Sequence, residues 1–217
     1  MTVANGFYLE WAVSGAVLVI FAALIGRATG YGVTGILIDG RGRYSLSRLQ
    51  LVLWTLLVLS TLLGLFFSSG YTKAGIDAAF NIPQTLLVLM GISVGSATVA
   101  GAVKSNKDLT GKVQTAGILP PTAALAKAAV AKGAVGPVLV KPHFAQIFLE
   151  EEGSQIDNVV DVSKFQNFFF TMALAVTFVV LVASSDPHAY PQFSEQVLWL
   201  LGLSHAGYVG GKLPTKA

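Results

Sequence analysis

The feature that most constrains this chain is a set of long stretches without a charged side chain. Uncharged runs of 24, 26 and 21 residues occupy positions 49–72, 78–103 and 165–185. At about 1.5 Å per helical residue, each run is long enough to cross a hydrocarbon core of roughly 30 Å. Two runs of 16 residues, 11–26 and 196–211, are marginal spans. Together they predict an all-α integral membrane protein with five transmembrane helices.

The basic residues predict how these helices are oriented. With the N-terminus outside the cell, segments 27–48, 104–164 and 212–217 face the cytoplasm and hold 13 of the 14 Lys and Arg residues. Cytoplasmic loops of multi-pass proteins carry such an excess of positive charge. We therefore expect an outside N-terminus and a cytoplasmic C-terminus. The basic residues would then face anionic lipid headgroups, and no nucleic-acid partner is expected.

A duplicated pattern divides the apolar runs into two hairpins. The tetrapeptides 47–50 and 163–166 share a Ser-basic-apolar-Gln pattern, and related Leu-x-Gly-apolar-Ser segments follow at 89–93 and 200–204. Internal duplication of helical units is common in membrane proteins. We expect two parallel helical-hairpin repeats plus one extra N-terminal helix that has no counterpart.

The predicted domain organisation follows from these spans. About sixty residues between the hairpins can bury only a small core, so this insertion is expected to lean on the membrane, a neighbouring subunit or a cytoplasmic protein. Its acidic run at 150–152 is interpreted as a solvated face that pairs with nearby basic residues. The segments are an N-terminal transmembrane helix (1–28), a cytoplasmic loop that can hold a β-hairpin (29–48), a first transmembrane hairpin (49–103), the cytoplasmic insertion (104–164), and a second transmembrane hairpin with a short cytoplasmic tail (165–217).

The Ser-x-x-Gln pattern is typical of a helix capping box. In that motif the Ser side chain accepts a hydrogen bond from an amide of the first turn, and the Gln side chain reaches back to the amide of the cap residue. Unpaired amides at a helix end are costly where the chain enters lipid. We predict such caps for Ser47 with Gln50 and for Ser163 with Gln166. A transport role for the two glutamines is the weaker alternative.

Small residues recur at helical spacing on the third and fifth predicted spans. In lipid, small side chains let helix backbones approach closely and gain contacts. We interpret them as helix-packing or oligomer interfaces, with the face of the third span left for a neighbouring subunit and that of the fifth packed within the chain. The residues are Gly91, Gly95, Ala97 and Gly101 on the third span, and Gly202, Ala206, Gly207 and Gly210 on the fifth.

Polar side chains on the same two spans offer a second interpretation, a conduction path through an oligomer. The spans contain no Asp, Glu, Lys or Arg, which argues against proton- or sodium-coupled transport. The candidate pore-lining residues are Ser93, Ser96, Thr98, Ser204 and His205.

The spans do not favour an enzyme. The Gly-x-Ser-x-Gly pattern at 91–95 matches a hydrolase elbow, but that chemistry needs a strand–turn–helix context and Ser93 lies in a predicted apolar helix. No carboxylate lies in any span to orient His205, and the chain lacks cysteine. We therefore predict no catalytic residues, no cofactor and no metal site.

The second hairpin resembles a group of small multi-pass proteins of the bacterial inner membrane. The resemblance rests on Ser-Lys-Phe-Gln-x-Phe-Phe-Phe-Thr at 163–171 with Leu-Leu-Gly-Leu-Ser-His-Ala-Gly-Tyr at 200–208. Segment 47–55 with 89–93 is similar to the first half of the same group. The resemblance implies residence in the bacterial inner (cytoplasmic) membrane and carries over no functional residues.

These patterns favour a non-enzymatic, self-associating membrane protein that acts as an anchor or scaffold for a cytoplasmic protein partner. The alternative is a homo-oligomeric ion channel or pore lined by Ser and Thr residues. Both interpretations expect membrane lipids and further copies of the chain as partners.

Overall fold

The computed structural model describes residues 3–110, 116–117, 138–139, 142–152, 156–184 and 189–213. Most of the predicted insertion, including 118–137, and the tail 214–217 lie outside the described residues. The elements found are α1 (Val3–Ala28), η1 (Gly35–Leu37), α2 (Leu46–Ser68), α3 (Lys73–Phe80), α4 (Gln84–Thr110), β1 (Ala116–Gly117), β2 (Val138–Leu139), η2 (Phe144–Ile147), α6 (Val162–Ser184) and α7 (Glu195–Gly210).

Four helices in the described part of the chain are long and apolar enough to cross a membrane. They are Gly6–Ala28, Leu46–Ser68, Gln84–Lys107 and Val162–Ser184, each with 23 or 24 residues and a mean hydropathy between 2.0 and 2.2. A helix satisfies its own backbone hydrogen bonds, which is what a lipid-exposed segment needs. The chain thus has the architecture of an all-α membrane protein. Helix α7 has 16 residues, about 24 Å by helical rise, and its crossing stays a prediction.

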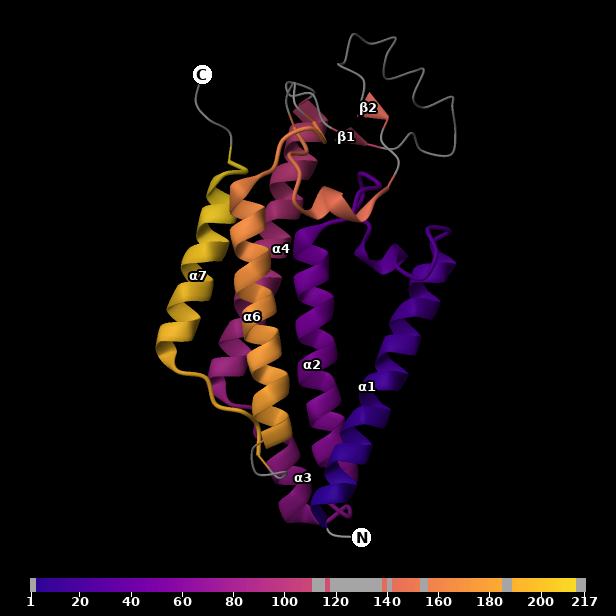
Figure 1. The fold of residues 1–217 in the computed structure, drawn as a ribbon, viewed down its shortest axis with the longest axis vertical. Coiled ribbons are helices and arrows are strands. Elements are labelled where there is room, and N and C mark those ends of the chain that lie inside the picture. The colour runs from indigo at the N-terminus through magenta and orange to yellow at the C-terminus, as the bar shows by residue number, and fades with distance from the viewer. Residues whose placement is uncertain are drawn as a thin grey trace.

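The four helices α2, α4, α7 and α6 form a closed bundle. Each packs on the next, in the order α2–α4, α4–α7, α7–α6 and α6–α2. Figure 1 shows α2 and α6 running in one direction and α4 and α7 running back. Like helices of the two hairpins are therefore neighbours. We call the end of the bundle at which α4 finishes and α6 begins the insertion end.

Large apolar side chains fill the bundle away from the insertion end. Trp54 on α2 meets Phe178 on α6 edge to face, with ring centroids 6.3 Å apart. Leu89 on α4 and Leu201 on α7 join the same cluster, and all four side chains are almost fully buried. At the far end, Tyr190 donates a hydrogen bond to the carbonyl of Ala79 at 2.6 Å, which ties the α6–α7 connection to α3.

The uncharged run 78–103 does not form one continuous helix. It is divided by the turn at 81–83, so that α3 ends at Phe80 and α4 begins at Gln84. Pro83 explains the break, because a proline lacks an amide hydrogen and is tolerated only in the first turn of a helix or before it. Helix α4 then continues to Thr110, beyond the predicted end of the first hairpin at 103.

Helix α1 packs on α2 and stands outside the bundle. Near the start of α1 the two backbones touch, since a Cβ added to Gly64 would lie 2.9 Å from the Cα of Trp11. The Trp11 indole donates a hydrogen bond to Ser60 Oγ at 3.2 Å. At the other end of α1, Gly26 packs directly on the backbone of Val33 and Gly35, with no room for a side chain. Both ends of α1 are therefore fixed.

The loop before α2 is a tight turn and not an extended hairpin. A single antiparallel bridge joins Ile38 and Tyr44. The carboxylate of Asp39 accepts hydrogen bonds from the amides of Arg41 and Arg43, at 3.0 and 3.2 Å. This turn places both guanidinium groups at the insertion end.

The capping boxes predicted from Ser-x-x-Gln are wrong for α2. That helix already begins at Leu46 with Ser45 as its cap residue, so Ser47 lies inside the first turn. Ser47 Oγ instead shares a 3.0 Å hydrogen bond with the hydroxyl of Tyr208 on α7. Gln50 is buried, and its side-chain amide donates a hydrogen bond to Asn167 on α6 and not to its own first turn. An unpaired polar group is costly in the interior of a membrane protein, and this bond across the bundle avoids that cost.

Helix α6 is also capped differently from the prediction. The carboxylate of Asp161 accepts a hydrogen bond from the amide of Lys164 at 3.1 Å, as an acidic cap residue does. Ser163 lies inside the helix and Gln166 is exposed. The Ser-x-x-Gln pattern therefore marks the first turn of both helices but supplies neither cap.

The small-residue faces do not hold the monomer together. A Cβ built on Gly91, Gly95, Gly101, Gly207 or Gly210 would meet nothing within 4 Å, and one on Gly202 would only reach Ile92 at 3.9 Å. The expectation that the face of the fifth span packs within the chain is therefore wrong at Gly207 and Gly210. Contacts between α4 and α7 use their buried sides, which carry Ser96 and His205.

Candidate functional site

A buried carboxylate lies at the centre of the insertion end. Glu151 is 6% exposed. Its Oε2 lies 2.6 Å from Lys104 Nζ on α4 and 3.7 Å from Arg41 Nη1 on the loop before α2. Its Oε1 lies 3.3 Å from Lys164 Nζ on α6 and also contacts Lys212 Nζ just after α7. One acidic side chain therefore joins four separate parts of the chain.

Further ion pairs surround this carboxylate. Lys104 also meets Asp39 at 2.8 Å. Glu152 pairs with Lys107 at 2.5 Å and with Arg41 at 3.2 Å. Together with the pair Arg43–Asp157 at 2.6 Å, they form a network that we call the Glu151 cluster: Asp39, Arg41, Arg43, Lys104, Lys107, Glu151, Glu152, Asp157, Lys164 and Lys212.

The Glu151 cluster keeps its central carboxylate ionised. Burial by itself would raise the pKa of Glu151, but the attraction of Lys104, Lys164 and Lys212 outweighs burial and holds that pKa well below the usual 4.5. Within the acidic run at 150–152, Glu151 and Glu152 pair with basic residues as expected, but Glu151 is buried and does not lie on a solvated face.

Local structure explains how the last part of the insertion reaches this position. Leu149 and Val160 form an antiparallel bridge that brings the described residues on either side of 153–155 together. Just before this bridge in the chain, the Gln146 side chain is fully buried, and its amide donates a hydrogen bond to the carboxylate of Asp157 at 3.2 Å. Its oxygen accepts from the amide of Tyr44 at 3.4 Å. This segment is therefore fastened to the loop before α2 as well as to the helices.

A polar layer lies one to two turns further into the bundle. The amide of Gln50 on α2 donates to Asn167 Oδ1 at 3.0 Å and to Thr171 Oγ1 at 2.7 Å, both on α6. Ser204 on α7 donates to the same Asn167 oxygen at 3.4 Å. His205 Nδ1 shares a 2.7 Å hydrogen bond with Ser96 on α4. The layer therefore links all four helices of the bundle.

The candidate pore residues divide between this layer and the outside. Four of the five are buried in the bundle: Ser93, Ser96, Ser204 and His205. The side chains of Ser96, Ser204 and His205 form hydrogen bonds with other protein groups. Thr98 is exposed on another side of α4 and donates to the carbonyl of Val94 at 2.8 Å. The five residues therefore do not share one face.

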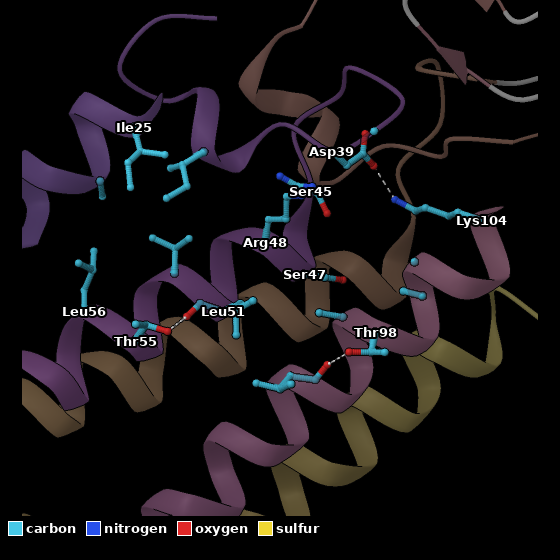
Figure 2. Close-up of a pocket in the computed structure, with 18 of the residues that line it drawn as sticks. Ile25, Asp39, Ser45, Ser47, Arg48, Leu51, Thr55, Leu56, Thr98 and Lys104 are labelled. Atoms are coloured by element: carbon cyan, nitrogen blue, oxygen red, sulfur yellow. Dashed lines mark hydrogen bonds and ion pairs between the residues drawn. The ribbon is translucent and has the colours of Figure 1, made fainter. Parts of the chain in front are cut away.

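A groove opens between α1, α2 and α4 beside the bundle. It has a volume of about 1060 Å³ and is lined mainly by apolar side chains, among them Phe21 and Ile25 on α1 and Leu51 and Leu56 on α2. Figure 2 shows Arg48 and Ser45 at one end of the groove, next to the ion pair of Asp39 and Lys104. The predicted interface residues Ala97 and Gly101 line its α4 wall, as does Thr98.

A shallower depression lies where α4 and α7 meet on the outside. It has a volume of about 240 Å³ and includes the predicted interface residues Gly95 and Ala206. Ile92 and Val99 give it an apolar rim.

Comparison with known proteins gives no relative. No family model matches the chain, and no curated protein or solved structure was found to be similar to it. The resemblance to small bacterial inner-membrane proteins therefore stays a prediction, and the interpretation of the site rests on its geometry.

Sequence reasoning missed the two residues that organise the sites. Asn167, which bonds both Gln50 and Ser204, sits among phenylalanines in a run that predicts only a span. Glu151 was one of three consecutive glutamates, and no pattern distinguishes it from its neighbours. One signal was available for Asn167, because a polar side chain within an apolar span is expected to face protein.

Proposed function

We propose that this protein is a non-enzymatic membrane anchor that presents its cytoplasmic insertion to a protein partner. The observation that carries the proposal is the Glu151 cluster. It joins the last turns of α4, where the chain leaves for the insertion, to residues 151 and 152, where the chain has returned. The two ends of the insertion are thereby held together by the same ion-pair network.

The chemistry of the Glu151 cluster and of the polar layer supports a structural role. The basic side chains of the Glu151 cluster form short ion pairs with carboxylates. The side chains of the polar layer form hydrogen bonds between neighbouring helices. Buried ion pairs and hydrogen bonds of this kind fix the relative positions of the helices. Five crossings with the insertion on the cytoplasmic side, two hairpin repeats and self-association through the open glycine faces complete the proposal.

A homo-oligomeric pore has less support. Ser96 and His205 bond each other in the α4–α7 contact, whereas Thr98 lies on the groove side of α4. A wetted path would have to break the hydrogen bonds of the polar layer, which are costly to lose in the interior of a membrane protein.

Photo-crosslinking in intact cells tests the anchor. A photoreactive amino acid at Leu125 in the insertion should give one discrete adduct with another protein, and the same group at Tyr71 beyond α2 serves as the control. Glu151→Gln should weaken the Leu125 adduct while the protein remains in the membrane fraction. No adduct at Leu125, or the same adduct at both positions, would overturn the proposal.

Reconstitution addresses the pore. Purified protein in sealed vesicles should not increase ion flux above that of empty vesicles. A flux that Ser96→Leu abolishes would reject the anchor as the principal function and favour the channel.

A further inference from the structure

We propose that the groove between α1, α2 and α4 binds one anionic phospholipid, with an acyl chain along its apolar walls and the phosphate at Arg48. The inference is independent of the anchor proposal, because it would stand if the insertion had no partner.

The dimensions of the groove fit one leaflet of a bilayer. Its apolar α2 wall runs from Leu51 to Leu59, which is about 12 Å of helix. Half of a hydrocarbon core is about 15 Å thick. The volume of about 1060 Å³ is at the upper end of the range of roughly 300–1,000 Å³ found for small-molecule sites. A single fatty-acyl chain is an occupant of this shape.

The walls of the groove are held apart and cannot close over it. The first half of α1 meets α2 where Trp11 packs on Gly64 and Gly15 packs on Ser60, and its end is fastened by Gly26 against the loop of Gly35. Between these points Phe21 and Ile25 remain exposed, at 61% and 43%. In the absence of an occupant, these apolar surfaces would face an empty space next to the lipid. Such voids are unfavourable, and a membrane lipid is the molecule available to fill this one.

The polar end of the groove carries one cation without an acidic partner. Four charged side chains line it. Lys104 pairs with Asp39 and Glu151, and Arg41 pairs with Glu151 and Glu152. Within the described residues, Arg48 has no carboxylate or hydrogen-bond acceptor against it and is exposed. An unpaired guanidinium at the edge of an apolar groove matches a lipid phosphate, which it can bind through two parallel hydrogen bonds.

Two further groups at this end point to an anion. Ser45, the cap residue of α2, is 6% exposed, lines the groove and makes no capping hydrogen bond with its side chain. The first amides of α2 are thus left without a side-chain cap beside Arg48. Free amides and the positive end of the helix dipole attract an anion. Figure 2 shows Ser45 and Arg48 at the same end of the groove.

Charge and location favour a lipid over a protein segment as the occupant. Arg48 lies in the first turn of α2, where the span of Leu46–Ser68 begins, and this is the level at which basic side chains meet lipid headgroups. A helix from a second copy would bring the same positive charge at this level and would repel Arg48. The phosphate of an anionic lipid offers the missing counter-charge.

Native mass spectrometry of the purified full-length protein tests the site. The probes are phosphatidylglycerol and phosphatidylcholine with identical acyl chains, offered in equal amounts to delipidated protein. We expect wild-type protein to retain one phosphatidylglycerol in preference to phosphatidylcholine. Arg48→Gln should lower this preference about tenfold, the loss expected for one charge-assisted hydrogen bond. Arg27→Gln, the same charge change at an exposed residue outside the groove, should leave it unchanged.

The acyl chain is tested separately from the phosphate. Ala97→Phe and Ala22→Phe place a ring into the groove from opposite walls, so either variant that retains the wild-type melting temperature should lose both lipids. Equal retention of the two lipids by the wild-type protein, or no effect of Arg48→Gln, would overturn the proposal. Lipid retention by a groove-filling variant that keeps the wild-type melting temperature would also overturn the proposal.

Cysteine labelling distinguishes the other occupants. The chain has no cysteine, so Thr55→Cys places a single thiol in the groove. Its modification by a maleimide should be slower with phosphatidylglycerol than with phosphatidylcholine. A disulfide-linked dimer through position 55 would assign the groove to a second copy and reject the lipid. Faster labelling after replacement of 111–137 by a Gly/Ser linker would assign it to the insertion and reject the lipid as well.

Discussion

At the scale of single residues, the protein depends on one carboxylate that balances several lysines. Lys104 on α4, Lys164 on α6 and Lys212 in the turn after α7 approach Glu151 from three directions. A buried ion pair contributes little compared with a well-packed apolar contact, because removing both charges from water is expensive. Removing one partner, however, leaves the other charge buried and unbalanced. Stability should therefore respond far more to loss of Glu151 than to loss of a neighbouring carboxylate.

Glu151→Gln tests this asymmetry. The change leaves the lysines close together without their common counter-charge, and we expect the free energy of unfolding to fall by about 3 to 5 kcal/mol. Denaturant unfolding in detergent micelles measures it. Glu150→Gln is the matched control, since Glu150 is the adjacent residue and has no ion pair in the described structure. Equal losses in the two variants would contradict the central role of Glu151.

The pH dependence of stability follows from the same carboxylate. The pKa of Glu151 is lower in the folded protein than the usual 4.5, so the unfolded chain binds this proton more readily. The stabilisation by Glu151 is complete above pH 4.5 and is lost as the pH falls through the lower, folded pKa. We expect the melting temperature of the wild-type protein to drop below pH 4.5 by more than that of Glu151→Gln. Parallel curves for the two proteins would refute this.

At the scale of elements, the sequence located the four long apolar helices but not where they begin and end. Uncharged length identified α2, α4 and α6, because burial in lipid excludes charge at every position of a span. The ends depend on tertiary contacts instead. Ser47 and Gln50 look like a cap in the sequence, but Tyr208 and Asn167 offer them partners that lie more than a hundred residues away. No local pattern contains that information.

The contact between α1 and α2 can be tested by a disulfide. A Cβ built on Gly15 lies 3.7 Å from the Cβ of Ser60, within the range of about 3.5–4.5 Å found in disulfides. Gly15→Cys with Ser60→Cys should therefore crosslink readily under mild oxidation, as judged by gel mobility. Gly15→Cys with Leu59→Cys is the control, since residue 59 is turned by about 100° around α2. Adding Gly64→Leu should reduce the crosslink, because its side chain meets Trp11. Equal yields at positions 59 and 60 would refute the packing.

At the scale of the whole molecule, the bundle and its groove could not be derived from the sequence. Composition and spacing identify the long apolar helices, but the order of helices around the bundle is set by which faces carry complementary side chains. The small residues illustrate this, since Gly95 and Gly207 have the same spacing pattern as packed glycines and yet face open space. They remain candidates for contacts between copies of the chain.

The open glycine faces give a prediction for assembly. Gly95→Leu should reduce the oligomer without lowering the melting temperature of the monomer, because the new side chain meets nothing within the chain but holds a second helix away. Gly207→Leu shows whether the α7 face contributes in the same way. Size-exclusion chromatography with light scattering in detergent measures both. Oligomers that persist unchanged in Gly95→Leu would exclude this face.

The orientation in the membrane is tested with single thiols at the two ends of the bundle. Tyr71 is 65% exposed beyond α2, and Val159 is 41% exposed at the insertion end. With the predicted topology, a membrane-impermeant maleimide should label Tyr71→Cys in intact cells and label Val159→Cys only after the membrane is opened. The reverse pattern would contradict an outside N-terminus.

The sequence separation within the Glu151 cluster has a consequence for biosynthesis. Asp39 and Arg41 emerge from the ribosome early, whereas Lys212 follows Glu151 by 61 residues. The contact between α1 and α2 needs only the first third of the chain, so this hairpin can settle while synthesis continues. Glu151 acquires its last cation only once α7 has been synthesised. A nascent chain that stops before that point lacks Lys212, so the charge around Glu151 is incomplete.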